Sequence, residues 1–309
     1  MAILHLKIMK PAIQVLLVSI FSVITNAEVT HTDTAEYEQA NDIAERFRFE
    51  KDVANNPFAI LPHKPNYLLP FTYARQNKTA YQKLSKNLEL DNVEAEFQIS
   101  LKFLAAENFL VDDLNVQLAF TSVSWWQTYN SELSAPFRET NYEPEVIFSY
   151  SRPWYLFSLP IRHSFIALNH QSNGQSVTLS RSWNRIKGGI VFEQSPLIFS
   201  LQSWWRIPED RKSDDSDVDG DDNPHIEKYL GYGSLGILWK MPKSHNLDIQ
   251  IRNNLRSDNK GSLKLGWSFP FTKQLRAYVQ YFNGYGESLI YYDKPIVRYG
   301  IGVKLTDWL

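Results

Sequence analysis

Residues 93–103 of this chain read VEAEFQISLKF, and this stretch decides the class of fold. Every second side chain, from Val93 to Phe103, is apolar, and all those between them are polar or charged. Such strict alternation is typical of a β-strand with one apolar and one polar face. The stretch is also long, because strands in soluble proteins usually have about 5–6 residues. A tilted strand that crosses a membrane needs about 9–11 residues.

The alternation continues through the rest of the chain. In the last stretch, 297–309, apolar residues again alternate with polar or small ones. Comparable stretches occur near 66–75, 114–126, 142–151, 154–170, 183–193, 197–207, 228–241, 245–254, 261–269 and 274–285. Outer-membrane barrels have an even number of antiparallel strands, and these stretches make about twelve. We therefore predict an all-β fold, a twelve-stranded antiparallel transmembrane β-barrel over residues 66–309.

A soluble β-sandwich or a large soluble barrel is the alternative. Strand length counts against it, and so does the placement of the aromatic residues, which make up 14% of the chain. They gather at the ends of predicted strands, as the aromatic girdles of a membrane barrel do. The pairs are Trp125–Trp126, Trp154–Tyr155, Trp204–Trp205 and Tyr291–Tyr292, and the chain ends on Trp308-Leu309. A closed barrel also satisfies every backbone group in lipid, which an open sheet does not.

The first 27 residues have the features of a signal peptide. Lys7 and Lys10 are basic, an apolar stretch runs over 12–24, and Ala27 ends a run of small residues suited to cleavage. A membrane anchor is the alternative, but a spanning helix needs about 20 apolar residues. Residues 28–65 are polar and lack the β pattern. They are compatible with one helix around 40–53 or with a mobile tail, and we expect them on the periplasmic side.

Composition excludes several functions. The formal net charge is -2, so no basic field indicates a nucleic-acid partner. The chain has no cysteine, which excludes disulfides, thiolate metal sites and a cysteine nucleophile.

The predicted turns alternate in length, as in outer-membrane barrels. Turns such as 151–153 and 242–244 are short, whereas 127–141, 171–182 and 208–227 are long and polar. The last of these contains a run of acidic residues that resembles the start of a calcium-binding loop. The closing bidentate glutamate is missing, so a solvated acidic loop is favoured over a calcium site.

One predicted hairpin contains residues of the types that hydrolases use in catalysis. His170 and Ser172 are two apart, which on a strand places them on one face, about 6–7 Å apart. Asn184 opens the returning strand, where its amide oxygen can hold the imidazole. Nucleophile, base and orienting residue form the arrangement of a serine hydrolase. Gly174 lets the backbone turn and present N–H groups to an oxyanion. A histidine and a serine at a barrel rim are nevertheless usually plain surface residues.

The alternation of side chains along the hairpin predicts that His170, Ser172 and Asn184 point outward from the barrel. Asn184 shares a face with Ile186 and Ile190, whereas Arg185 and Lys187 lie on the opposite face. A catalytic set on the lipid-facing side suits a lipid substrate. An aspartate there would bury a charge, and asparagine avoids this cost. Because asparagine stabilises an imidazolium less, a bound cation would have to supply positive field.

Several long motifs closely resemble outer membrane phospholipase A. They are NHQSNG at 169–174, SRSWNR at 180–185, SWWQ at 124–127, PFRETNYEP at 136–144, DDNP at 221–224 and GYGESLI at 284–290. The resemblance runs from about residue 56 to the C-terminus. It implies a twelve-stranded barrel that hydrolyses phospholipid acyl esters at both glycerol positions. Ser172 would be the nucleophile, His170 the base, and Asn184 the residue that orients His170.

The resemblance also implies a calcium-dependent homodimer in an outer membrane. The family's catalytic calcium would be held by the Ser180 hydroxyl and the Gln175 carbonyl of one subunit and by the Ser134 carbonyl of the other. Some relatives bind a further calcium with the residue that matches Asp222. This chain departs from those relatives, because Val177 stands where they have an aspartate that helps to bind this second calcium.

Two further departures are visible. Gln175 replaces the family's usual arginine, a change that should not affect a ligand provided by the backbone carbonyl. Ser122 stands where relatives can place a glutamine at the dimer interface. A non-enzymatic porin or structural barrel remains the alternative function. A soluble secreted lipase is disfavoured, because the Gly-x-Ser-x-Gly elbow is missing.

Overall fold

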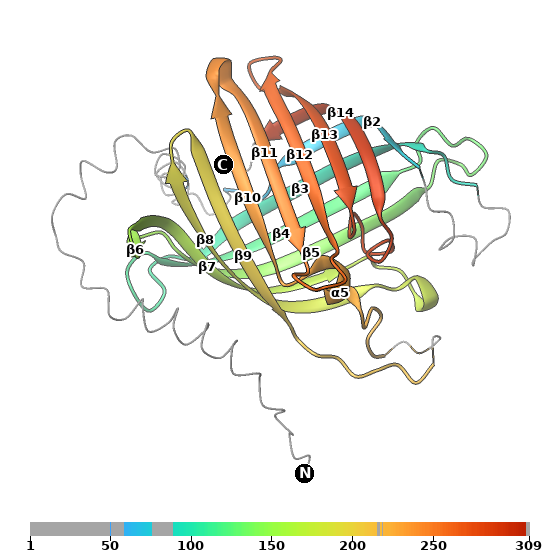
Figure 1. The fold of residues 1–309 in the computed structure, drawn as a ribbon, viewed down its shortest axis with the longest axis horizontal. Coiled ribbons are helices and arrows are strands. Elements are labelled where there is room, and N and C mark those ends of the chain that lie inside the picture. The colour runs from blue at the N-terminus through green and yellow to red at the C-terminus, as the bar shows by residue number, and fades with distance from the viewer. Residues whose placement is uncertain (1–49, 51–58, 76–88, 215–216, 218, 307–309) are drawn as a thin grey trace, which may run out of the picture. The chain divides into compact units, whose positions relative to one another are not determined.

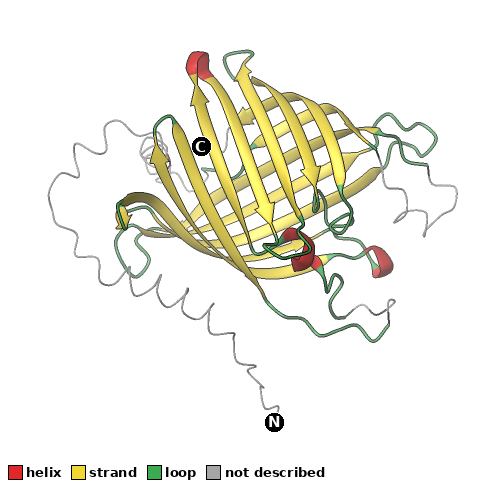
Figure 2. Cartoon of the chain, viewed as in Figure 1, coloured by secondary structure: helices red, strands yellow, loops and turns green. Residues whose placement is uncertain are grey.

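The computed structural model describes residues 50, 59–75, 89–214, 217 and 219–306, which all belong to one compact unit spanning 41–309. Most of this part of the chain is β-strand, with three short helical turns (Figure 2). The predicted signal peptide, most of segment 28–65 and the terminal Trp308-Leu309 lie outside the described residues. Among the described helices, none has the length and apolar character needed to cross a membrane.

Twelve long strands form a closed antiparallel barrel, which confirms the predicted fold (Figure 1). The strands are β2 (Asn66–Ala74), β3 (Val93–Ala106), β4 (Leu114–Trp126), β5 (Phe137–Tyr150), β7 (Leu159–Ser172), β8 (Ser182–Gln194), β9 (Leu197–Arg206), β10 (Gly233–Met241), β11 (His245–Asn253), β12 (Gly261–Pro270), β13 (Arg276–Gly284) and β14 (Ile296–Thr306). Neighbours in sequence pair with one another, and β14 pairs with β2. The pairing of β2 with β3 and of β3 with β4 completes the ring.

The barrel is apolar outside and polar inside. On β3, Ile99, Leu101 and Phe103 are between 40% and 51% exposed, whereas Glu94 and Ser100 are fully buried. On other strands, large apolar residues such as Phe120 on β4 and Ile301 on β14 are exposed in the same way, at 46% and 58%. A soluble protein buries its large apolar side chains instead. The outer surface is therefore suited to contact with lipid, and the strand pattern seen in the sequence has this physical cause.

Ion pairs fill the barrel interior. Arg298 Nη2 lies 2.7 Å from Glu94 Oε1, and Arg138 Nη2 lies 2.9 Å from the same atom. All three side chains are fully buried. A second group includes Lys187 on β8, whose Nζ is 2.8 Å from Glu145 Oε1. Buried charges of opposite sign compensate one another in this way when little water is available to solvate them.

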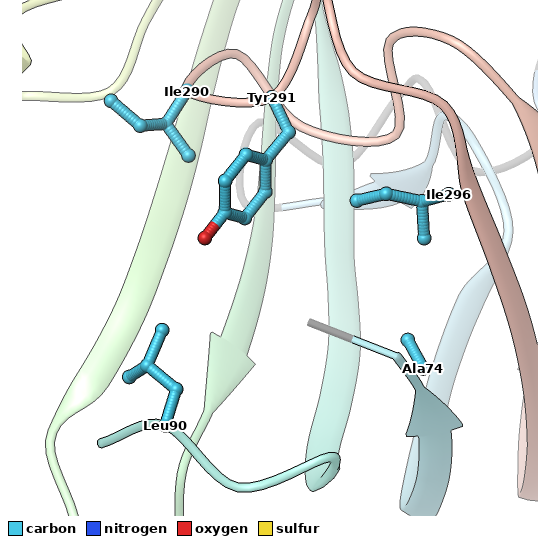
Figure 3. Close-up of a cluster of buried hydrophobic side chains, with 5 residues drawn as sticks. All are labelled: Ala74, Leu90, Ile290, Tyr291 and Ile296. Atoms are coloured by element: carbon cyan, nitrogen blue, oxygen red, sulfur yellow. The ribbon is translucent and has the colours of Figure 1, made fainter. Parts of the chain in front are cut away.

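The loop from β13 to β14 covers the barrel mouth on the side of the long connections. Its Leu289 N–H donates to Asn141 Oδ1, and its Ile290 N–H donates to Glu139 Oε1. The loop packs through a small apolar cluster, in which the ring of Tyr291 is fully buried (Figure 3). The other members are Ala74, Leu90, Ile290 and Ile296. This end of the barrel is thus built from packed side chains.

Some element boundaries differ from the prediction. The stretch 154–170 is interrupted, because β6 (Trp154–Leu156) turns back onto the start of β7. The stretch 228–241 begins with a short helix, α5 (Ile226–Leu230), before β10. Part of the expected tail 28–65 also belongs to the barrel wall. There β1 (Leu61–Pro62) pairs with β3, and Lys64 Nζ lies 2.6 Å from Glu143 Oε2.

Candidate active site

The candidate site is built on the pairing of β7 with β8. The ladder places His170 directly opposite Asn184 and Ser172 opposite Ser182. His170 Nδ1 lies 2.8 Å from Asn184 Oδ1, which is hydrogen-bonding distance. Because an amide oxygen only accepts, the Nδ1 atom of His170 carries the proton in this contact. The Nε2 atom is then left as an acceptor.

The side chains of this set lie on the outer face of the barrel. Leu168, which has the same phase as His170 on β7, is 51% exposed. The alternate residues point inward: Arg185 Nε donates to Asn169 Oδ1 at 2.8 Å, and both side chains are buried. His170, Ser172 and Asn184 are each half-buried. They therefore lie where the apolar belt meets the connection between β7 and β8.

Ser172 is the last residue of β7, and its neighbour across the ladder on β5 is the exposed Tyr142. Its alternation with Gln171 puts its side chain on the His170 face, about 6–7 Å further along the strand. Within the described residues, its hydroxyl makes no hydrogen bond. The structure thus brings His170 and Asn184 into contact and leaves Ser172 beside them with a free hydroxyl. Contacts in catalytic sites often tighten only when substrate binds.

Asn173 organises the connection that follows Ser172. Its buried side chain accepts from the Arg181 N–H at 2.9 Å and donates to the Leu179 carbonyl at 2.9 Å. Gly174 follows with φ +62°, in the left-handed region, and a Cβ atom there would lie 3.1 Å from the Tyr142 ring. A side chain at this position would be strained and crowded. Glycine therefore lets the chain turn immediately after Ser172.

The predicted calcium ligands fall into two groups. Ser180 Oγ donates to Asp222 Oδ2 at 2.6 Å, so the two side chains are adjacent. Gln175 and Ser134 are both exposed on loops. Hydroxyl, carboxylate and carbonyl oxygens are the ligands that calcium prefers, so the Ser180 hydroxyl and the backbone carbonyls of Gln175 and Ser134 are suitable in kind for this ion. Among the described residues, no three acidic or histidine side chains gather into a self-sufficient metal site.

Asp222 already has a cationic partner. Its second oxygen, Oδ1, lies 2.6 Å from Lys212 Nζ, and both side chains are largely buried. The residue next to it, Asp221, pairs with Arg206 at the end of β9. Ser182 N–H donates to Asn223 Oδ1 at 3.1 Å, which ties the same segment to the start of β8. The acidic connection after β9 is therefore attached to the candidate site.

Sequence reasoning missed one neighbour of the site. Glu209 Oε1 accepts from Asn184 Nδ2 at 2.7 Å, although Glu209 lies in the acidic connection. The hairpin between β8 and β9 has a two-residue turn, Ser195–Pro196, and its register places Ile207 opposite Asn184. That register is readable from the sequence once the two strands are paired. Glu209 was not singled out from the sequence, because it is one of many acidic residues in the connection after β9.

Comparison with known proteins identifies the family of this chain. The phospholipase A1 family profile matches residues 43–305, most of the chain. This chain belongs to the phospholipase A1 family. It is 36% identical to phospholipase A1 of Proteus vulgaris, over 82% of this chain and 83% of that protein. It is 34% identical to phospholipase A1 of Escherichia coli K12, with the same two shares of coverage.

Solved structures of family members share the fold. The outer membrane phospholipase A of Escherichia coli superposes with a TM-score of 0.74 at 34% identity, over 82% of this chain and 95% of that one. The outer membrane phospholipase of Salmonella typhi, a dimer with bound calcium, gives a TM-score of 0.76 at 33% identity. That comparison covers 84% of this chain and 97% of the other. The resemblance expected from the motifs is thereby confirmed at the level of the phospholipase A1 family.

Proposed function

We propose that this chain is an integral outer-membrane phospholipase that hydrolyses the sn-1 and sn-2 acyl esters of phospholipids and lysophospholipids. Ser172 is the nucleophile, His170 the general base and Asn184 the residue that orients His170. The observation that carries the proposal is the 2.8 Å contact of His170 Nδ1 with Asn184 Oδ1 on the lipid-facing side of the barrel. Family membership supports the substrate class.

The residues support a two-step acyl transfer. His170 Nε2 takes the proton of the Ser172 hydroxyl as its oxygen attacks the ester carbonyl. The ester bond then breaks, His170 returns the proton to the leaving glycerol oxygen, and the acyl group stays on Ser172. A water molecule, activated by the same base, releases the fatty acid and restores Ser172. Throughout, Asn184 holds the imidazole so that Nε2 faces Ser172.

The negative oxygen formed by the attack needs positive partners. Backbone N–H groups of the turn at Gly174 are one source. Calcium, held by the Ser180 hydroxyl, the Gln175 carbonyl and Ser134 of the partner subunit, would supply the other as a Lewis acid. We leave Asp222 out of this set, because Lys212 already neutralises its carboxylate. A further calcium on Asp222 would have to displace that ammonium group.

The proposal includes a homodimer. A calcium ion usually takes about 6–8 oxygen ligands, and Ser180 and Gln175 provide only part of this number, with water filling the remainder. Ligands drawn from two subunits would complete the site on association. The Salmonella typhi relative is a dimer with bound calcium, which supports a homodimer that binds this ion.

A porin is the second candidate, since it uses the same architecture. The interior does not favour it. Glu94, Arg138 and Arg298 form a fully buried ion-pair network inside the barrel, where a porin has a water-filled channel. A soluble lipase would require an exterior suited to water, and the exposed side chains of β3 are apolar.

Hydrolysis by membranes that contain the protein tests the proposal. Wild type should release fatty acid from phospholipids carrying a different chain at each glycerol position, and the Ser172→Ala variant should release neither chain. Ser203→Ala is a matched control, because Ser203 is an exposed serine on the neighbouring strand β9. Full hydrolysis by Ser172→Ala would refute the assignment. Salt washing should leave the protein in the membrane fraction, and its release would contradict an integral barrel.

A further inference from the structure

Asn184 makes two hydrogen bonds with its side chain, and only one of them belongs to the proposed triad. Its Oδ1 atom faces His170, and its Nδ2 atom donates to Glu209 Oε1 at 2.7 Å. We propose that Glu209 is a positioning residue for catalysis, which extends the set to Ser172, His170, Asn184 and Glu209. This inference rests on the proposed function and adds a residue to it.

The backbone holds Glu209 beside Asn184. Ile207 N–H donates to the Asn184 carbonyl at 2.8 Å, immediately after the last ladder pair of β8 and β9. Pro208 follows, and its ring fixes the backbone φ angle before Glu209. On the inner side, Arg206 binds Asp221 and donates to the Asn223 carbonyl at 3.1 Å. The two residues that precede Pro208 are therefore anchored, Ile207 through its backbone and Arg206 through its side chain.

A carboxylate at this position fixes the orientation of the asparagine amide. An amide group has one accepting and one donating end, and the two ends can exchange by rotation. A carboxylate only accepts hydrogen bonds, so it selects the orientation with Nδ2 toward Glu209. Oδ1 then faces His170, which needs an acceptor to keep its proton on Nδ1. Glu209 thus determines the tautomer of His170 through Asn184.

Glu209 also supplies a negative charge near His170. Asparagine carries no charge to stabilise the imidazolium that forms when Ser172 is deprotonated. Hydrogen bonds in series polarise one another, so a negative acceptor at Nδ2 makes Oδ1 a better acceptor for His170. Glu209 lies in the connection beyond the strand end, whereas a carboxylate at position 184 would face the lipid. The arrangement keeps the charge close to His170 and out of the apolar belt.

The first experiment measures phospholipid hydrolysis by purified protein in detergent micelles, with calcium. Glu209→Gln removes the charge but keeps an acceptor, and Glu209→Ala removes both. We expect kcat to fall about tenfold in Glu209→Ala and less in Glu209→Gln, with little change in KM, because a lost orienting hydrogen bond affects the transition state. Asp210→Asn is the matched control, since Asp210 is the adjacent exposed carboxylate, and it should retain wild-type kcat. Unchanged kcat in Glu209→Ala would overturn the proposal.

A charge exchange separates positioning from a merely structural role. Asn184→Asp alone places two carboxylates within hydrogen-bond distance and should lose activity by repulsion. Adding Glu209→Gln restores a donor opposite the new carboxylate and removes the repulsion, so the double variant should recover part of the lost activity. Failure of the double variant to exceed Asn184→Asp would overturn the proposal, as would full activity of Asn184→Asp alone.

Ser172→Ala, assayed in parallel, keeps the two hypotheses apart. If Ser172→Ala is inactive while every Glu209 variant is fully active, only the role of Glu209 is wrong. If Ser172→Ala is as active as wild type, the proposed function itself fails. Circular dichroism and heat-modified gel migration should show that all variants keep the barrel fold.

Discussion

His170 Nδ1 lies 2.8 Å from Asn184 Oδ1, directly across the ladder between β7 and β8. The contact is made by two residues that face outward from the barrel, and in the proposed mechanism it orients the imidazole toward Ser172. The two residues would have unequal roles, because His170 would transfer a proton and Asn184 would only orient the imidazole of His170. The two side chains should therefore differ in how much activity depends on them.

We predict that Asn184→Ala loses less activity than His170→Ala. Without the amide the imidazole can still reach Ser172 part of the time, whereas without the imidazole no base remains. The measurement is the initial rate of phospholipid hydrolysis by refolded variants at equal concentration. Equal and complete loss in a correctly folded Asn184→Ala protein would show that its role goes beyond orientation.

Calcium binding and dimerisation should be coupled. If the catalytic site takes ligands from two subunits, calcium favours the dimer, and dimerisation raises calcium affinity by the same factor. Calcium affinity and the dimer fraction should therefore rise together in a detergent titration, and a chelator should dissociate the dimer and stop hydrolysis. A demonstrably monomeric protein with full calcium-dependent activity would contradict the shared site.

The buried charges inside the barrel should be needed for stability. Arg298 pairs with Glu94 and Glu287, and its side chain is fully buried. Arg298→Ala leaves these two buried carboxylates with Arg138 as their remaining cationic partner and should lower the free energy of unfolding by about 3–5 kcal/mol. Arg256→Ala removes an exposed partner of Asp258 and should cost about 0–1 kcal/mol. Urea unfolding in detergent compares the two, and equal small effects would argue against the network.

Gly174 should be sensitive to the smallest substitution. Its φ of +62° is unfavourable for alanine, and the added Cβ atom would lie 3.1 Å from the Tyr142 ring. The strain is about 1–2 kcal/mol, and the turn after Ser172 would shift to relieve it. Gly174→Ala should therefore reduce hydrolysis, whereas Ser176→Ala, in the same loop, should reduce it less. Wild-type rates in Gly174→Ala would mean that the turn does not position the site.

Much of the fold was predictable because lipid outside and charge inside impose a strict alternation on each strand. Residues 93–103 show it without exception, and β3 contains all of them. The break after Leu156 could not be predicted, because the residues on both sides of this tight turn are apolar. At the site, His170, Ser172 and Asn184 lie on one hairpin, so their spacing in the sequence was enough to predict that they come together. Glu209 comes from another hairpin, so only strand register reveals it.

Chemical labelling of the nucleophile tests the proposed mechanism most directly. Purified protein in micelles with calcium can be treated with a sulfonyl fluoride and digested, and the labelled peptide identified by mass spectrometry. We predict a single label on Ser172 that grows in parallel with the loss of phospholipid hydrolysis, and no label in Ser172→Ala. Label on another residue, or complete inactivation with Ser172 unmodified, would contradict it.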